Sequence, residues 1–320
     1  MRIFFLFLMV AMTGAAQAQN AYPARQITII APYTAGGSTD LVARVISEGL
    51  RGKLKQSVVV ENKPGGSGVI GTREVVKAAP DGYTLLLGNA GGLVIPAAMS
   101  SNYPFDLLRD LVPISVSAEF VGVMMVKQAL PVNSLKEFIA YAKARPGQLN
   151  FGSSGVGSSV HLAAELLMKE TGITMQHVPY KGGASSMTDL LSGTLDVLFA
   201  SSPVGVGQAG NQNIKFMAVT SRYRLQQLPN VPTMEESGLP GFEVTSWMGV
   251  FGPAELPEAI RNQLSRALVE IVAEPETQAR LRSIGFEPLG KNAAQFDKIY
   301  RTDIKKWFAF VQERGLKDAK

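Results

Sequence analysis

Glycine- and hydroxyl-rich segments that follow apolar strands are the parts of this sequence best suited to binding chemistry. The clearest is residues 32–40, which follows a strand expected at Ile27–Ala31 and precedes a helix expected from Leu41, where apolar residues recur at helical spacing. Helix N-termini offer unpaired N–H groups and a positive dipole end, and glycines admit close approach by a ligand. A carboxylate or phosphate would fit such a site, but for this loop taken alone an ordinary strand-to-helix turn capped by Ser38 or Thr39 is the interpretation to prefer.

A second segment repeats this plan in the other half of the chain. Residues 153–159 follow a strand expected at 149–152 and open a helix that carries Val160, Ala163, Ala164 and Leu167 on one face. Because ligands of parallel sheets lie at the carboxyl ends of strands, the two segments are expected to converge. Shorter glycine- or serine-rich loops are predicted at 62–68, 88–92, 179–183 and 201–203.

Catalytic and metal sites are not expected. The chain has no cysteine and only two histidines, His161 and His177, so disulfides, thiolate chemistry and clustered metal ligands are excluded. Neither a Gly-x-Ser-x-Gly elbow nor a phosphate-loop signature is present. His161, in the first turn of its helix, could contact a ligand or only pack or cap, whereas His177 is expected in a core position. Lys63 and Lys181 are interpreted as solvated turn residues, and contact with a charge at the far end of a ligand is the alternative. No cofactor is predicted.

The N-terminus has the pattern of an export signal. Residues 1–18 hold Arg2, a short apolar run and a small-residue ending, so cleavage after Ala18 is expected. Removal of Arg2 takes the formal charge of the full chain from +5 to +4, and the basic residues are scattered, which argues against a nucleic-acid partner. We therefore expect an exported, monomeric protein located in the periplasm.

Strand and helix patterns alternate along the chain and predict an α/β fold with a mainly parallel sheet. Further strands are expected at 57–61, 83–87, 121–126, 176–178, 195–200, 216–220 and 242–251, and later helices at 258–273, 275–284 and 296–311. The length favours two domains. The closing helices should return to the first domain, which gives two lobes around a ligand cleft with two interdomain crossovers, near Phe120 and Trp247. The expected division is 19–122 with 249–320 as domain 1, and 123–248 as domain 2.

These motifs together resemble the periplasmic solute receptors of the tripartite tricarboxylate transporter group, the Bug proteins. The resemblance spans nearly the whole mature chain and is carried by PYTAGGSTD (32–40), VENKPG (60–65), PDGYTL (80–85), GVGS (155–158), HLA (161–163), HVPYKG (177–182) and LPNVPT (228–233). It implies a type II two-lobed periplasmic binding fold that closes on a small organic carboxylate and delivers it to membrane permease subunits.

The resemblance also implies where one ligand carboxylate is held. It places residues 34–38 of the first lobe and Ser154, Gly155, Ser158 and Ser159 of the second around that carboxylate, partly through backbone N–H groups and water. Members that take amino acids often carry a polar or acidic group where the strand at 195–200 ends. Here Ala200 stands in that place, so a ligand with an ammonium group is not expected.

The combined prediction is a non-enzymatic receptor, with a periplasmic hydrolase or an orphan receptor docking on a membrane sensor kinase as alternatives. Ser38 and Ser158 are expected to face each other across the cleft and serve one carboxylate. Tyr33 and Trp247 are expected either in the cleft wall or in core and hinge packing. The predicted ligand-binding residues are Tyr33, Thr34, Ala35, Gly36, Gly37, Ser38, Asp40, Asn89, Ala90, Ser153, Ser154, Gly155, Ser158, Ser159, His161, Tyr180, Ala200 and Ser201.

Overall fold

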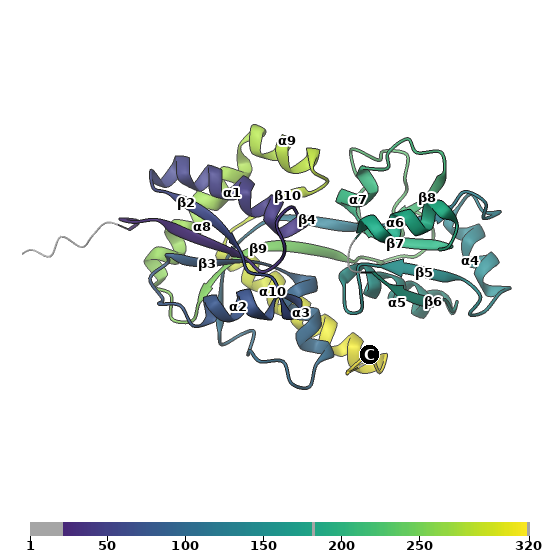
Figure 1. The fold of residues 1–320 in the computed structure, drawn as a ribbon, viewed down its shortest axis with the longest axis horizontal. Helices are drawn as coiled ribbons and strands as arrows, with labels where there is room; N and C mark the ends of the chain where they lie inside the picture. The colour runs from purple at the N-terminus through teal and green to yellow at the C-terminus, as the bar shows by residue number, and fades with distance from the viewer. Residues whose placement is uncertain (1–21, 181–182, 319–320) are drawn as a thin grey trace, which may run out of the picture.

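The computed structural model describes residues 22–180 and 183–318, which form two α/β lobes side by side (Figure 1). The strands are β1 (Ile27–Ala31), β2 (Val58–Asn62), β3 (Thr84–Asn89), β4 (Leu111–Lys127), β5 (Asn150–Ser153), β6 (Gln176–Pro179), β7 (Val197–Ser201), β8 (Ile214–Val219), β9 (Thr245–Pro253) and β10 (Glu287–Lys291). The helices are α1 (Ser38–Leu54), α2 (Val69–Val76), α3 (Ala90–Met99), α4 (Leu135–Lys143), α5 (Ser159–Thr171), α6 (Gly183–Ser192), α7 (Ser202–Val206), α8 (Glu258–Ala273), α9 (Pro275–Ser283) and α10 (Ala293–Glu313), with a 3₁₀ turn η1 (Gly66–Gly68). The predicted signal segment lies outside the described residues.

The sheet follows the order β2-β1-β3-β9-β4-β7-β5-β6, and β10 and β8 also pair with β4. Parallel pairing is found where it was expected near both ends, between β1 and its neighbours β2 and β3, and between β5 and its neighbours β6 and β7. The prediction of a mainly parallel sheet is wrong for the centre, where β4 and β9 pair antiparallel to all their neighbours. These two strands are not joined to their neighbours through strand–helix–strand units, so the parallel rule does not reach them.

Strands β4 and β9 run side by side from one lobe into the other. The first part of β4 pairs with β9 and β10, and its last part, from Gly122 to Lys127, pairs with β7 and β8. Phe120 of β4 lies opposite Ser246 of β9, and Glu119 lies opposite Trp247. The lobes are therefore connected by a two-stranded ribbon that contains both predicted crossover residues.

The first lobe buries both faces of its sheet. Ile27 and Ile29 of β1 point to a core shared with α1 and α8, whereas Ile30 points to the opposite core, which includes α3 and α10. Apart from Thr28, β1 therefore has apolar residues on both faces. A sheet that is covered by helices on both sides requires this pattern. Helix α1 packs so closely on α8 that a Cβ at Gly49 would lie 2.4 Å from a side-chain carbon of Ile271.

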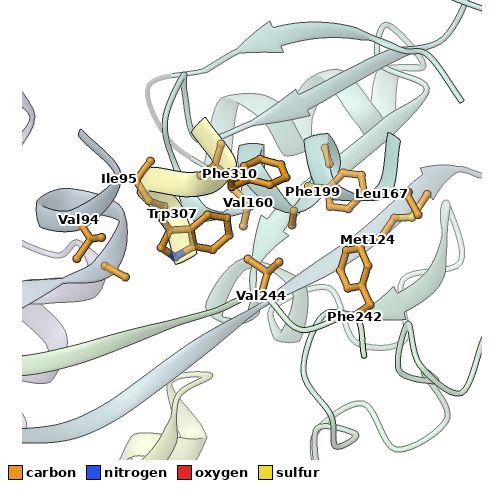
Figure 2. Packing of buried hydrophobic residues seen from close by; sticks show 14 of the residues in the cluster. Val94, Ile95, Met124, Val160, Leu167, Phe199, Phe242, Val244, Trp307 and Phe310 are labelled. Carbon is orange, nitrogen blue, oxygen red and sulfur yellow. The ribbon is translucent and has the colours of Figure 1, made fainter. Parts of the chain in front are cut away.

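Helix α10 packs on the first lobe and also reaches the second. Figure 2 shows Trp307 and Phe310 of α10 packed among side chains of α3 and α5, including Ile95 and Val160. Just beyond α10, Arg314 donates to the Glu165 carboxylate on α5 at 2.7 Å. The end of α10 therefore contacts both lobes, in addition to the ribbon.

Trp247 belongs to this packing and is not among the residues that line the cavity between the lobes described below. Its ring is 2% exposed, lies against Phe251, Phe296 and Tyr300, and donates Nε1–H to Asp303 at 2.7 Å. Of the roles expected for it, core packing is the one that these contacts show.

The prediction of a glycine-rich loop at residues 88–92 is wrong, because β3 continues to Asn89 and α3 begins at Ala90. Gly92 lies inside α3. A Cβ at this position would lie 1.8 Å from the Tyr33 hydroxyl oxygen, so a larger residue would not fit beside Tyr33. Packing of Tyr33 on the helix thus explains a glycine that local propensity assigns to a loop. Across residues 22–180 and 183–318, no helix combines the length and apolar character needed to cross a bilayer.

Candidate functional site

A cavity of about 610 Å³ lies between the lobes, at the carboxyl ends of strands from both. Its lining residues from the first lobe and the ribbon are Tyr33, Thr34, Gly36, Gly37, Ser38, Thr39, Leu41, Ser67, Asn89, Gly91, Pro96, Phe120 and Met248. Those from the second lobe are Ser154, Val156, Gly157, Ser158, Ser159, Val160, Ser201, Pro203 and Val204. We call this cavity the cleft.

The helices α1, α3 and α5 begin at the cleft. The first turn-closing bond of α1 runs from Leu41 N to Gly37 O, and that of α5 from Leu162 N to Ser158 O, so the preceding N–H groups have no partner within their helix. The first turns of α3 and α5 come together across the lobes, because a Cβ at Gly91 would lie 3.5 Å from Ser159 N. Three positive dipole ends therefore face one space, which is favourable for an anion.

The loop before α1 is held in shape by a buried carboxylate. Asp40 Oδ2 accepts hydrogen bonds from Gly36 N and from Arg44 Nε, both at 2.9 Å. Burial opposes ionisation of Asp40, but these bonds outweigh it and lower the pKa of the carboxyl. Gly36 adopts φ +79°, a left-handed conformation that glycine accepts without strain. Asp40 thus fixes the loop from behind while Gly36, Gly37 and Ser38 face the cleft.

The loop before α5 is held mainly by serine hydroxyls. Ser158 is the N-cap, since its Oγ accepts from His161 N at 3.2 Å, and the same hydroxyl donates to Gly155 O at 2.9 Å. Ser153 Oγ accepts from Gly155 N at 3.1 Å. The hydroxyl proton of Ser158 is therefore already engaged inside the protein, whereas within the described residues the Ser38 hydroxyl makes no hydrogen bond and Gly37 is the N-cap of α1.

The first-lobe wall also carries fixed polar groups. Asn89, which is 8% exposed, donates Nδ2–H to Thr39 Oγ1 at 3.3 Å. Burial raises the pKa of Tyr33 to about 12, and a hydrogen bond with Asn89 opposes that rise. The Tyr33 hydroxyl therefore keeps its proton at neutral pH and donates to Ser67 O at 3.4 Å.

Apolar side chains complete the cleft. Phe120 and Met248, both on the ribbon, lie among the lining residues with Val160 and Val204 of the second lobe. None of the described lining residues carries a formal charge at neutral pH, so the features there that favour an anion are the helix N-termini. Such an arrangement can hold a small organic anion with its carboxylate at the helix ends and its carbon body on the apolar wall.

The structure brings many of the predicted residues together. Those that border the cleft are Tyr33, Thr34, Gly36, Gly37, Ser38, Asn89, Ser154, Ser158, Ser159 and Ser201. Those that do not border it are Ala35, Asp40, Ala90, Ser153, Gly155, His161, Tyr180 and Ala200. The ligand role of each residue stays a prediction.

Several lining residues were not predicted. Phe120 and Met248 look like ordinary core residues of strands, and Pro96 looks like a helix terminator, so no local pattern marks them. Thr39, Gly91 and Gly157 could have been found, since each adjoins a residue that was chosen.

The two histidines lie behind the second-lobe loop. His161 is 4% exposed and stacks on His177 with ring centroids 4.1 Å apart. Burial lowers the pKa of both to about 4, with a further contribution to His177 from the neighbouring His161 ring. Both rings are thus neutral at pH 7. Lys63 pairs with Glu61 and Glu74 at 3.3 and 3.5 Å on the surface, as expected for a turn residue, and Lys181 lies outside the described residues.

Comparison with known proteins agrees with this geometry. Residues 42–316 match the family model of the tripartite tricarboxylate transporter family receptor. The protein BugT of Bordetella pertussis is 34% identical over 313 residues, which cover 98% of this chain and 96% of BugT.

Two solved structures of relatives were determined with a bound acid. Rpa4515 of Rhodopseudomonas palustris with adipate superposes with a TM-score of 0.82 at 33% identity and covers 92% of this chain and 98% of its own. MatC from the same organism, with bound malate, has a TM-score of 0.78 at 27% identity and covers 91% of this chain and 100% of its own. Family model, relatives and two-lobed fold agree, and this chain belongs to the Bug-type receptors of the tripartite tricarboxylate transporter family.

Proposed function

We propose that this protein is an extracytoplasmic receptor that binds one small organic carboxylate in the cleft and delivers it to the membrane permease of a tripartite tricarboxylate-type transporter. The observation that carries the proposal is the convergence of the N-termini of α1, α3 and α5 on one uncharged, partly apolar cleft. The division of the lobes into 19–122 with 249–320 and 123–248 is part of the proposal, as is export to the periplasm by the segment 1–18.

The arrangement supports binding rather than turnover. Buried His161 and half-buried His177 are neutral and do not border the cleft, and the hydroxyl of Ser158 is engaged in capping. A serine hydrolase needs a base within hydrogen-bond reach of its nucleophile, and none of the serines among the described lining residues has a hydrogen bond to an imidazole ring.

The kind of ligand follows from the relatives and the cleft together. Rpa4515 was solved with adipate and MatC with malate, so aliphatic di-acids are the first compounds to test. Ser38, Tyr33 and Asn89 supply polar contacts on one wall, and Phe120 and Met248 supply an apolar surface for the carbon chain.

A thermal-shift screen of the mature protein tests the binding function. Because a ligand that binds only the folded form raises the melting temperature, at least one organic acid should raise it while the corresponding neutral amide does not. Equal shifts with acid and amide would contradict the prediction that the cleft selects an anion. Sustained hydrolysis of a carboxylate ester by the pure protein would mean that the protein is an enzyme and not a receptor.

Delivery to a transporter is tested in cells. Deletion of the gene should abolish uptake of the radiolabelled acid that binds in the screen, and the wild-type gene should restore it. Normal uptake in the deletion strain would leave the binding function intact and contradict the transport role.

A further inference from the structure

We propose that His161 is a positioning residue for the ligand, which holds the second-lobe cleft loop through its ring nitrogen Nδ1. The cleft loop is defined here as residues 153–158. The inference rests on the proposed receptor function and adds a role for a side chain that does not itself border the cleft.

The contact that carries the inference is a hydrogen bond from the loop backbone to the ring. Gly157 N donates to His161 Nδ1 at 3.2 Å. Gly157 borders the cleft and has φ +76°, and Ser158, the next residue, is the N-cap of α5. The ring thus fixes the backbone at the point where the loop passes into the helix, immediately before the N–H groups that face the cleft.

This bond defines the state of the imidazole. A nitrogen that accepts a hydrogen bond carries no proton, so neutral His161 must hold its proton on Nε2. Nε2 lies 3.7 Å from Glu165 Oε1, which is where a positively polarised N–H is favoured. Burial lowers the pKa of His161 to about 4, so the accepting form is the stable form at neutral pH.

The other end of the loop is held by the second histidine. His177 Nε2 lies 2.7 Å from Ser153 Oγ, which in turn accepts from Gly155 N at 3.1 Å. The two imidazoles stack at a centroid distance of 4.1 Å. Both ends of the loop therefore depend on one stacked pair of neutral rings.

His161 also links the cleft loop to the first lobe, through Glu165. Glu165, which faces His161 from the next turn of α5, accepts from Arg314 Nη2 at 2.7 Å. Arg314 directly follows α10 of the first lobe. A continuous line of contacts thus runs from Gly157 through His161 and Glu165 to a helix that packs on both lobes.

The experiment compares two replacements of His161 in the full mature protein. His161→Leu replaces the ring with an apolar side chain of similar reach and removes the acceptor. His161→Asn also removes the ring and its stack on His177, but it places an amide oxygen near the position of Nδ1. The first readout is amide hydrogen exchange of residues 153–158 without ligand. We expect about tenfold faster exchange of the Gly157 amide in His161→Leu, and exchange close to the parent in His161→Asn.

The second readout is affinity for the acid, tested among adipate, malate and related organic acids, that gives the parent its largest melting shift. His161→Leu should bind it about tenfold more weakly, and His161→Asn within about threefold of the parent. Both variants are melted without ligand, so that a general loss of folding is recognised by faster exchange throughout the chain.

The outcomes separate the two proposals. Unchanged exchange at Gly157 in a folded His161→Leu protein, or equal losses in the Leu and Asn variants, overturns the role of Nδ1. Binding of the acid by the parent and by His161→Leu with equal affinity overturns the inference and leaves the receptor function standing. If no organic acid binds the parent, the proposed function fails and the positioning role falls with it.

Discussion

Two serines at the cleft are predicted to give opposite results when their hydroxyls are removed. Ser38 is the first residue of α1, borders the cleft and makes no hydrogen bond within the part of the chain that is described, while Gly37 takes the N-cap position. Its hydroxyl is free to donate to a carboxylate. A hydrogen bond to a charged group contributes about 1.5–3 kcal/mol, so Ser38→Ala should weaken acid binding by a factor of roughly 10 to 150. Folding should change by less than about 0.5 kcal/mol.

Ser158 should behave in the reverse way. Its hydroxyl caps α5 and bonds to Gly155 O, so Ser158→Ala should cost about 1 kcal/mol of folding free energy and lower the melting temperature by a few degrees at most. Ser158→Gly should cost only a few tenths of a kcal/mol, because glycine tolerates the cap position. Affinity for the acid should stay close to that of the parent in the glycine variant.

Calorimetric titration with the acid and melting of the ligand-free variants measure the two quantities separately. Parent-like affinity in Ser38→Ala would mean that backbone N–H groups alone hold the carboxylate. A tenfold loss of affinity in Ser158→Gly with an unchanged melting temperature would mean that this hydroxyl leaves its cap to bind the ligand, as the sequence alone had suggested, and would refute the assignment made here.

Two further predictions concern packing and pH. Gly92→Ala should lower both folding stability and acid affinity, because the new Cβ would lie 1.8 Å from the Tyr33 hydroxyl oxygen. In the control variant Gly91→Ala the nearest contact of the new Cβ is 3.4 Å, so the ligand-free protein should melt no lower than the parent. Equal melting temperatures of the two variants would contradict this prediction. Because burial lowers the pKa of His161 and His177 from 6.5 to about 4, the unfolded chain binds more protons between these values, so their contribution to folding is complete above pH 6.5 and is lost as pH falls towards 4. For His161 this loss is on the order of 2 to 3 kcal/mol. In denaturant titrations from pH 7 to pH 4, the free energy of unfolding should therefore fall less steeply in the double variant His161→Asn, His177→Asn than in the parent. An equally steep fall in the double variant would mean that other groups cause the acid sensitivity.

The sequence predicts well those elements whose pattern is local. The helix at Glu258–Ala273 and the passage from β1 into α1 both follow from the spacing of apolar residues and from the glycine pair before Ser38. The convergence of loops from two lobes follows from the rule that ligands lie at the carboxyl ends of strands.

Elements that depend on distant partners were predicted less well. Strand β4 begins at Leu111, ten residues before the strand expected at 121–126, because its first part contains Pro113 and buried serines that do not resemble a strand until β9 and β10 supply the pairing. Strand β10 contains Pro288 and Gly290 and was not predicted at all. The start of α3 was assigned to a loop at 88–92 because of its glycines, one of which, Gly92, leaves room for the Tyr33 side chain.

The site shows the same division. Lining residues on the two glycine- and serine-rich loops were predictable from residue type, but His161, whose helical position suggested access to the cleft, is turned behind the loop by its bond to Gly157. Phe120 and Met248 border the cleft because the ribbon crosses between the lobes at that point. No pattern local to either residue distinguishes a cleft floor from a core.

The central claim is that the helix N-termini of both lobes hold one carboxylate. A crystal structure of the mature protein with the acid that gives the largest melting shift tests this most directly. One carboxylate should lie in the cleft between the first turns of α1 and α5, with its oxygens about 2.7–3.2 Å from backbone N–H groups or from waters bound to them. A carboxylate bound outside the cleft, or one in the cleft held by side chains with the helix ends left unoccupied, would contradict the account.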